Sequence, residues 1–317
     1  MNKYKALAMG GAVFASSAIL LAACGSPDEP PRGGKGLRIA ATTGILADIT
    51  RNVTGDGAEV VQVVPDGVSP HDFQLSAKGR AELQSADLVV ANGAGLEAGV
   101  GVDSIDAPTW ILTENAGALI DSADEKPHGD DADDAHSHGS EDDGGGDPHV
   151  WMDPDRVARA VPSLAGRLGK LDPAGSRGFR ENAGRYASQL RSLAESMALT
   201  LAEVPPASRE LVTSHDSLAY FAKRFGFEVV ATPFPSSGAE GEVSAQSIAE
   251  VERAIRRTRV PAIFSQAGDD PAVLEQIARR TGVEVVLGLL VESPGTAKTY
   301  GRMMRRDATL IARALRP

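Results

Sequence analysis

Cysteine is nearly absent from this chain of 317 residues, in which Cys24 is the only one. A single thiol cannot form a disulfide within the chain, and none is left over for a zinc site of the cysteine type. Any bound metal must therefore be held by histidine, aspartate and glutamate side chains. Histidine is also scarce, with six in the whole sequence. A metal site with imidazole ligands can therefore lie only where some of these six histidines come together.

Positive charge is in short supply, because 32 lysines and arginines face 43 aspartates and glutamates. The net charge of −11 becomes −13 if the N-terminal segment with Lys3 and Lys5 is removed. Such a chain binds nucleic acid and anionic membrane surfaces poorly, so we expect no nucleic-acid partner. A cationic ligand suits the charge better.

Common hydrolase motifs are missing as well, since the sequence contains no HExxH, no G-x-S-x-G and no P-loop. A metallohydrolase would use histidines and carboxylates, but it also needs an open coordination position and a general base. We therefore predict that the chain is not an enzyme.

The first residues have the pattern of an export signal. Lys3 and Lys5 precede an apolar stretch, 6–23, which ends in small residues directly before Cys24. A basic start, an apolar core and small residues before the cleavage point are typical of a secretory signal, here 1–23. The cysteine makes it similar to a bacterial lipoprotein signal, which implies acylation of Cys24 and a lipid anchor on the outer side of the cell membrane. The alternative is a transmembrane helix, for which the stretch is slightly short of the ~20 residues needed.

Past the signal, the sequence divides into a short linker and two regions of alternating strands and helices. Residues 24–36 are rich in Pro and Gly and predict a flexible tether. Apolar strand candidates alternate with helix candidates over 37–171 and again over 207–317. Such alternation predicts parallel sheets covered by helices on both faces. We therefore expect an α/β protein of two lobes, each a parallel sheet flanked by helices.

A long helix is predicted between the two lobes, over 172–206. Apolar residues recur at spacings of three and four from Phe179 to Val204, which is the period of one helix face. Asp172-Pro173 offers an N-cap followed by Pro at the first helical position. Pro205-Pro206 ends the pattern. This helix is expected to join the lobes.

An acidic segment interrupts the first lobe at 121–147. It contains eleven aspartates and glutamates, one lysine, several glycines and the histidines His128, His136 and His138. A composition with so few apolar residues predicts a disordered loop. The histidines could form a loose secondary site that collects metal for a tighter one. Alternatively, the loop is a solvated insertion that binds metal only incidentally.

The other three histidines, His71, His149 and His215, are far apart in sequence but occupy similar places. Two follow predicted strands, and His149 lies just before a predicted helix. In open α/β sheets, ligands bind beyond the carboxyl ends of the strands. A lone histidine in a loop is more often solvated than a ligand, but no histidine occurs elsewhere in the folded part. The joint pattern favours one shared site.

Five stretches resemble the metal-specific solute-binding proteins of ABC importers, the zinc and manganese family known as cluster A-I. They are SPHDF, ADLVVANGAGLE, DPHVWMDP, TSHDSLAYFAKRFGFE and VESPGTAKTYGRMMRRDATLIARAL, in the family's order. The resemblance implies one metal between the lobes, with His71, His149, His215 and Glu292 as its ligands. Because the family usually has Asp in the place of Glu292, Asp269 and Asp270 are rival ligands, whose alternative role is to cap the helix that starts at Pro271.

The resemblance also implies a cargo and partners. Manganese-specific relatives tend to have Glu where His215 stands, and imidazole suits zinc, so zinc is favoured over manganese. Asp72, Asp153 and Asp216 could orient the imidazoles or cap helices. The expected protein is a monomer that delivers zinc to a membrane permease, and its partners are this permease and, through it, the ATPase of the importer. A manganese-binding component, or a zinc-binding adhesin or storage lipoprotein, is the alternative.

Overall fold

The computed structural model describes residues 36–121, 146–234 and 243–316. The predicted signal, the predicted tether up to Lys35 with Cys24, and the histidines His128, His136 and His138 lie outside the described residues. The chain from Gly36 onward forms one compact unit. In the part of it that the structure describes, no helix has the length and apolar character needed to cross a membrane.

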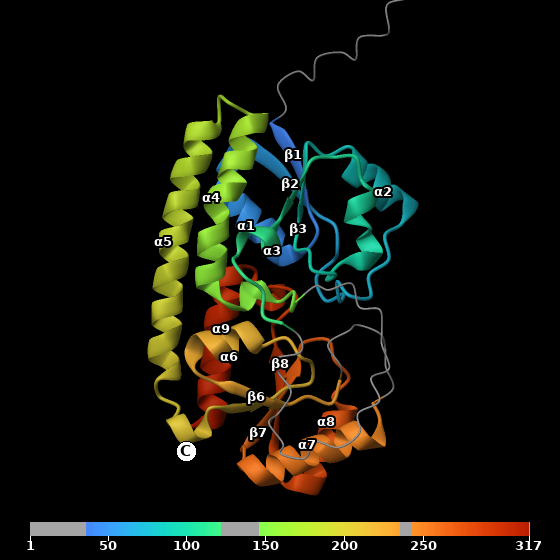
Figure 1. The fold of residues 1–317 in the computed structure, drawn as a ribbon, viewed down its shortest axis with the longest axis vertical. Helices are drawn as coiled ribbons and strands as arrows, with labels where there is room; N and C mark the ends of the chain where they lie inside the picture. The colour runs from blue at the N-terminus through green and yellow to red at the C-terminus, as the bar shows by residue number, and fades with distance from the viewer. Residues whose placement is uncertain (1–35, 122–145, 235–242, 317) are drawn as a thin grey trace, which may run out of the picture. The chain divides into compact units, whose positions relative to one another are not determined.

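The N-terminal lobe is built on a four-stranded parallel sheet with the strand order β2-β1-β3-β4. Its central strand β1 pairs with β2 on one side and β3 on the other. Figure 1 shows α2 on one side of this sheet and α4 with α5 on the other. The elements of this lobe are β1 (Leu37–Ala41), α1 (Gly44–Thr54), β2 (Ala58–Gln62), α2 (Ala77–Gln84), β3 (Leu88–Ala91), β4 (Thr109–Ile111), α3 (Leu112–Asn115) and α4 (Pro154–Leu171).

The C-terminal lobe contains two parallel strand pairs, β5 with β6 and β7 with β8. An isolated parallel bridge between Thr213 and Phe264 connects them. The elements are β5 (Glu210–Val212), α6 (Ala219–Phe225), β6 (Glu228–Ala231), α7 (Ala245–Thr258), β7 (Ala262–Gln266), α8 (Ala272–Thr281), β8 (Glu284–Leu289) and α9 (Tyr300–Leu315). The predicted fold class, parallel sheets flanked by helices in two lobes, is confirmed.

The long helix is α5 (Ser176–Leu201), and it packs against α1, α4 and α9. Its predicted start at Asp172 is wrong. Helix α4 continues to Leu171, so Asp172 ends that helix, and its Oδ1 accepts a hydrogen bond of 3.1 Å from the amide of Ala174 in the turn that follows. The aspartate and proline therefore shape the reversal between two helices. The predicted apolar stripe is buried from Phe179 to Val204.

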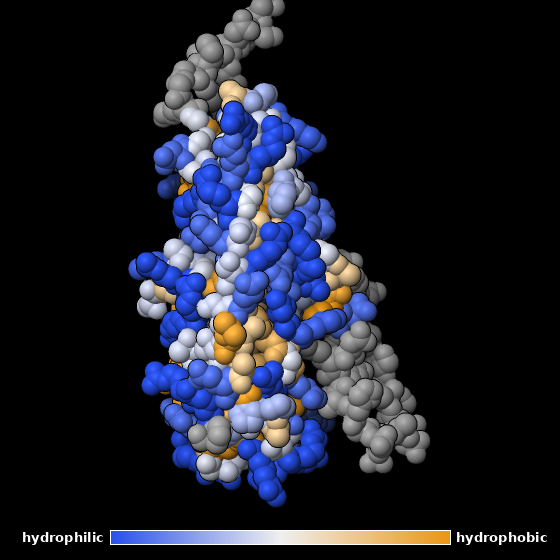
Figure 2. Space-filling model, turned by 90° about the vertical axis from the view of Figure 1, so that its left-hand side faces the viewer, coloured by the Kyte–Doolittle hydropathy of each residue, from blue (hydrophilic) through white to orange (hydrophobic). Residues whose placement is uncertain are grey.

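One hydrophobic core runs through both lobes. The same cluster of buried side chains contains Ile39 and Leu46 from the first lobe and Phe221 and Ile311 from the second. Burying apolar surface contributes roughly 25 cal/mol per Å², so the shared core stabilises the two lobes against each other. The outer face on the side of α5 is mostly hydrophilic, with a smaller hydrophobic area below its middle (Figure 2).

Candidate metal centre

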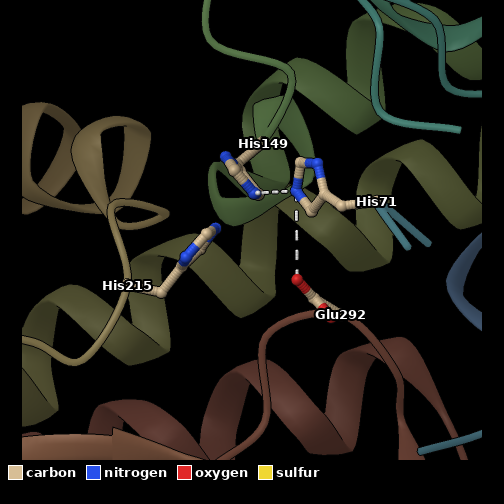
Figure 3. Close-up of side chains that lie close together, drawn as sticks. All are labelled: His71, His149, His215 and Glu292. Carbon is tan, nitrogen blue, oxygen red and sulfur yellow. Dashed lines mark hydrogen bonds and ion pairs between the residues drawn. The ribbon is translucent and has the colours of Figure 1, made fainter. Parts of the chain in front are cut away.

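Four loops bring the predicted ligands together. His71 lies after β2, His149 directly before the 3-10 turn Val150–Met152, His215 after β5 and Glu292 after β8. The four side chains point toward one another in Figure 3. Because three of these loops follow the carboxyl ends of parallel strands, the site lies where ligands bind in open α/β sheets.

The spacing of the ligand atoms suits a single ion. One ligand atom from each of the four residues lies within 4.8 Å of all the others. The Nε2 atoms of His71 and His149 are 3.4 Å apart, and His71 Nε2 is 3.9 Å from Glu292 Oε1. Two nitrogen ligands at about 2.05 Å from a tetrahedral zinc are roughly 3.3 Å apart. The arrangement therefore needs only small adjustments to hold one ion.

The ring of His215 completes the group from the C-terminal lobe. Its centroid is 5.6 Å from the ring of His71 and 5.9 Å from that of His149. Its Nε2 is buried and has no hydrogen-bond partner among the residues that the structure describes. Leaving a buried polar atom unpaired is costly, and a metal ion would satisfy it.

His149 is held by a carboxylate that sequence reasoning missed. Its Nδ1 lies 2.7 Å from Asp147 Oδ1, and the same oxygen accepts the backbone amide of His149 at 2.8 Å. A proton on Nδ1 leaves the lone pair of Nε2 pointing into the site, which is how outer carboxylates orient metal-binding histidines. Composition had assigned Asp147 to the acidic loop. The available signal was an aspartate two residues before a candidate ligand.

The backbone of Asp147 is hydrogen-bonded to the residues that precede position 122 in the chain. Its amide donates to the carbonyl of Ile120 at 2.8 Å. Its carbonyl accepts the Tyr220 hydroxyl at 2.8 Å, and the same hydroxyl accepts the amide of Ile120 at 3.0 Å. Tyr220 belongs to α6, on the chain segment that follows His215. The contacts of Asp147 therefore connect both lobes beside the candidate ligands.

The structure gives different surroundings to Asp72, Asp153 and Asp216, the three aspartates that were expected to orient the imidazoles or cap helices. Asp153 caps α4, because its Oδ1 accepts the amide of Asp155 at 2.9 Å. Asp72 is exposed and makes no hydrogen bond to the site histidines within the described residues. The negative charge of Asp216 favours the protonated form of His149 and His215, against the larger opposing effect of burial on their pKa values.

The rival ligands Asp269 and Asp270 are not part of the cluster of ligand atoms. Asp269 Oδ2 accepts hydrogen bonds from the Ser214 hydroxyl at 2.5 Å and from the amide of Gln266 at 3.2 Å. Asp270 Oδ1 accepts the amide of Ala272 at 3.0 Å, at the start of α8. Both carboxylates are engaged in local structure, as their alternative role predicts, and Glu292 is the carboxylate that faces the histidines.

Burial and charge set different protonation states for the three histidines. Burial, together with repulsion from His149, lowers the pKa of His71 to about 3 and that of His215 to about 4. Burial also opposes protonation of His149, but the charge and hydrogen bond of Asp147 more than offset it, so its pKa is raised. His71 and His215 are therefore neutral and ready to bind a cation at neutral pH.

Glu292 is also buried enough for its charge to depend on its neighbours. Burial raises its pKa, while the charge of His149 and a hydrogen bond from the Ser69 hydroxyl lower it in part. A cation bound in the site would favour the ionised carboxylate in the same way.

The sequence matches the family described as "Zinc-uptake complex component A periplasmic" over residues 39–314. The chain belongs to this family. It is 26% identical over 305 residues to the manganese ABC transporter substrate-binding lipoprotein PsaA of Streptococcus pneumoniae, covering 94% of this chain and 96% of the relative. It is 29% identical over 311 residues to the iron-binding protein YfeA of Yersinia pestis, covering 95% and 93%.

A solved structure has the same fold. The periplasmic zinc-binding protein TroA from Treponema pallidum matches with a TM-score of 0.76 and 26% identity, covering 90% of this chain and all of that one. The family consists of metal-binding components of ABC transporters, so the prediction that the chain is not an enzyme is confirmed. The relatives are named for manganese, iron and zinc, so membership alone leaves the identity of the metal open.

Proposed function

We propose that this chain is the extracytoplasmic component of an ABC importer that captures zinc and delivers it to the membrane permease. The observation that supports this most directly is the group formed by His71, His149, His215 and Glu292, whose ligand atoms lie within 4.8 Å of one another. Three imidazoles and one carboxylate make a closed tetrahedral ligand set for zinc. Because no coordination position remains open, the site suits transport better than catalysis.

Zinc is preferred to manganese on the chemistry of the donors. Three of the four donors are imidazole nitrogens, which suit zinc, whereas manganese is better served by carboxylate, carbonyl and water oxygens. Manganese is the competing cargo, because the relative PsaA is named as a manganese protein.

Competition between the two metals tests the proposal. The protein is stripped of metal, and its affinities for zinc and manganese are measured against chelators of known strength. We expect tighter binding of zinc at one site, and a large loss of zinc affinity in His149→Ala. Tighter binding of manganese would exclude zinc as the cargo, and unchanged affinity in His149→Ala would exclude the site.

We further propose that the protein is anchored through an acylated Cys24, after removal of 1–23, and that 24–36 tether the two-lobed unit. Cys24→Ser should release the protein from the membrane without changing its zinc affinity. Retention of an unprocessed form in the membrane would favour the transmembrane alternative. A loose secondary site at His128, His136 and His138, and a monomeric state, also belong to this proposal.

An adhesin or storage lipoprotein would have the same fold and site. Co-expression with a permease and an ATPase discriminates the two, since only a transport component increases zinc uptake by the cell.

A further inference from the structure

A hydrogen bond across the lobes connects the segments that carry two candidate ligands. The indole Nε1 of Trp151 donates to the backbone carbonyl of Val291 at 2.8 Å, over 140 positions of sequence. Trp151 lies two residues after His149, and Val291 directly precedes Glu292. Both residues are buried, with 3% and 2% of their surface exposed. Water therefore cannot readily replace this bond.

Trp151 is itself fixed on the side of His149. Its backbone carbonyl accepts the hydroxyl of Tyr300 at 2.5 Å, and the amide of Tyr300 donates to Asp48 Oδ2 at 2.9 Å. The indole ring packs edge-on against the ring of His149, with centroids 5.2 Å apart. The indole N–H therefore has a defined position relative to the imidazole.

The loop that follows β8 and carries Glu292 is held by hydrogen bonds to side chains, because β8 itself ends at Leu289. Past that strand, the amide of Leu290 donates to Asp307 Oδ1 at 3.2 Å, and the indole of Trp151 holds the carbonyl of Val291. Beyond them, the Ser69 hydroxyl reaches the carboxylate of Glu292 itself. The backbone directly before the candidate ligand is thus held by side chains in place of strand pairing.

We propose that Trp151 is a positioning residue that fixes the reach of Glu292 and thereby favours zinc over manganese, an inference that rests on the proposed function. A glutamate side chain has one more rotatable bond than an aspartate, so a fixed backbone is needed to present one oxygen to the ion. A loosened loop would let the carboxylate bind through both oxygens or admit water. Either change suits manganese, which favours oxygen ligands in a larger coordination shell.

The test compares the two tryptophans of the chain. Trp110 serves as the control, because its side chain is also buried and its indole also donates a hydrogen bond, to the exposed Ser163 Oγ at 3.1 Å, away from the candidate ligands. We expect Trp151→Phe to weaken zinc binding roughly tenfold, the scale of one buried hydrogen bond, and manganese binding by less. Trp110→Phe should leave both affinities, and their ratio, unchanged.

A double variant tests whether Trp151 acts by positioning Glu292 or only by stabilising the fold. In Glu292→Ala, adding Trp151→Phe should cause no further loss of zinc affinity, since the carboxylate that the indole positions is gone. An equal loss in that background, an equal loss in Trp110→Phe, or an unchanged ratio of zinc to manganese affinity in Trp151→Phe would overturn the inference.

Should Trp151→Phe fail to fold, Tyr300→Phe loosens the same segment from its other side, and we expect a smaller fall in the ratio. No fall in a folded Tyr300→Phe would then overturn the inference. Failure of the unaltered protein to bind zinc would instead refute the proposed function, so the two results remain distinguishable.

Discussion

His149 is fully buried, and its two ring nitrogens face different surroundings. Nδ1 contacts the carboxylate of Asp147, whereas Nε2 faces His71 and the candidate metal position. The other two site histidines have strongly lowered pKa values, to about 3 and about 4. Competition between metal and protons near neutral pH should therefore occur mainly at His149.

The pH dependence of zinc binding should reflect one histidine. Below the raised pKa of His149 the metal must displace its proton, whereas His71 and His215 are already neutral above about pH 5. The logarithm of the affinity should therefore rise with a slope of about one through the pKa of His149 and level off above it. At the acidic end the slope should increase, because burial raises the pKa of Glu292 and its carboxyl group then also takes up a proton. Chelator competition between pH 5 and 8 measures this slope.

A slope near three would contradict this assignment. It would indicate that all three histidines titrate near the ordinary pKa of about 6.5, as the sequence alone suggests. The fluorescence of metal-free Trp110→Phe gives an independent measurement. Trp151 is then the only tryptophan, and its ring is close enough to His149 to respond to protonation of that ring.

Loss of Glu292 should cost less zinc affinity than loss of His149. The Glu292 side chain is 19% exposed, so water can take the place of its oxygen in Glu292→Ala. We expect a loss of at least the roughly 10–100-fold that follows removal of an outer partner of a metal ligand. His149→Ala removes a nitrogen donor and also leaves the carboxylate of Asp147 without its partner, so its loss should be larger.

Chelator competition on both variants checks this order. Unchanged affinity in Glu292→Ala, combined with a large loss in Asp269→Ala or Asp270→Ala, would assign the fourth ligand to the β7–α8 loop.

At the scale of the elements, the residues that flank the acidic segment lie close enough together for 122–145 to be deleted. The amide of Asp147 already bonds to the carbonyl of Ile120. Removing 122–145 would leave Ile120-Asp121-Gly146-Asp147, whose first and last residues make the hydrogen bond of a β-turn, with Asp-Gly at its centre. We expect this variant to keep the tight zinc site, because Asp147 and its contact with His149 remain.

Equilibrium dialysis with zinc measures the result. The full chain should bind additional zinc weakly, and the shortened chain should bind only the tight equivalent. Loss of tight binding on excision would show that the loop supplies ligands to the main site.

The sequence predicted the parallel strands, the long helix and the candidate histidines, because periodicity is local and six histidines leave few choices. It misplaced the start of α5, since an Asp-Pro pair suits the reversal between two helices as well as a helix start. The hydrogen bonds of Asp147 with Ile120 and Tyr220, and that of Trp151 with Val291, could not be predicted, because they join segments that meet only after folding. Composition offered no sign that the last residue of an acidic stretch folds back.

For the whole molecule, zinc should act as a stabilising ligand, since its candidate ligands come from both lobes. A ligand that binds only the folded state stabilises it by about 2.7 kcal/mol at a free concentration a hundred times the dissociation constant. The melting temperature should therefore rise with zinc and fall again on addition of a chelator.

Calorimetry measures the shift, with the His149→Ala variant as the control. An equal shift in that variant would show that the stabilisation comes from zinc bound elsewhere.

The helix α5 and the shared core have a consequence for the speed of transport. A helix of 26 residues, about 39 Å long, packs against α1 in one lobe and α9 in the other. Swinging the lobes apart would strain this helix and expose part of a continuous apolar core, at a cost proportional to the area uncovered. The residence time of the ion should therefore depend on small displacements of the loops around His71 and Glu292. A permease that pulls on those loops alone could shorten that time without unfolding or rotating either lobe.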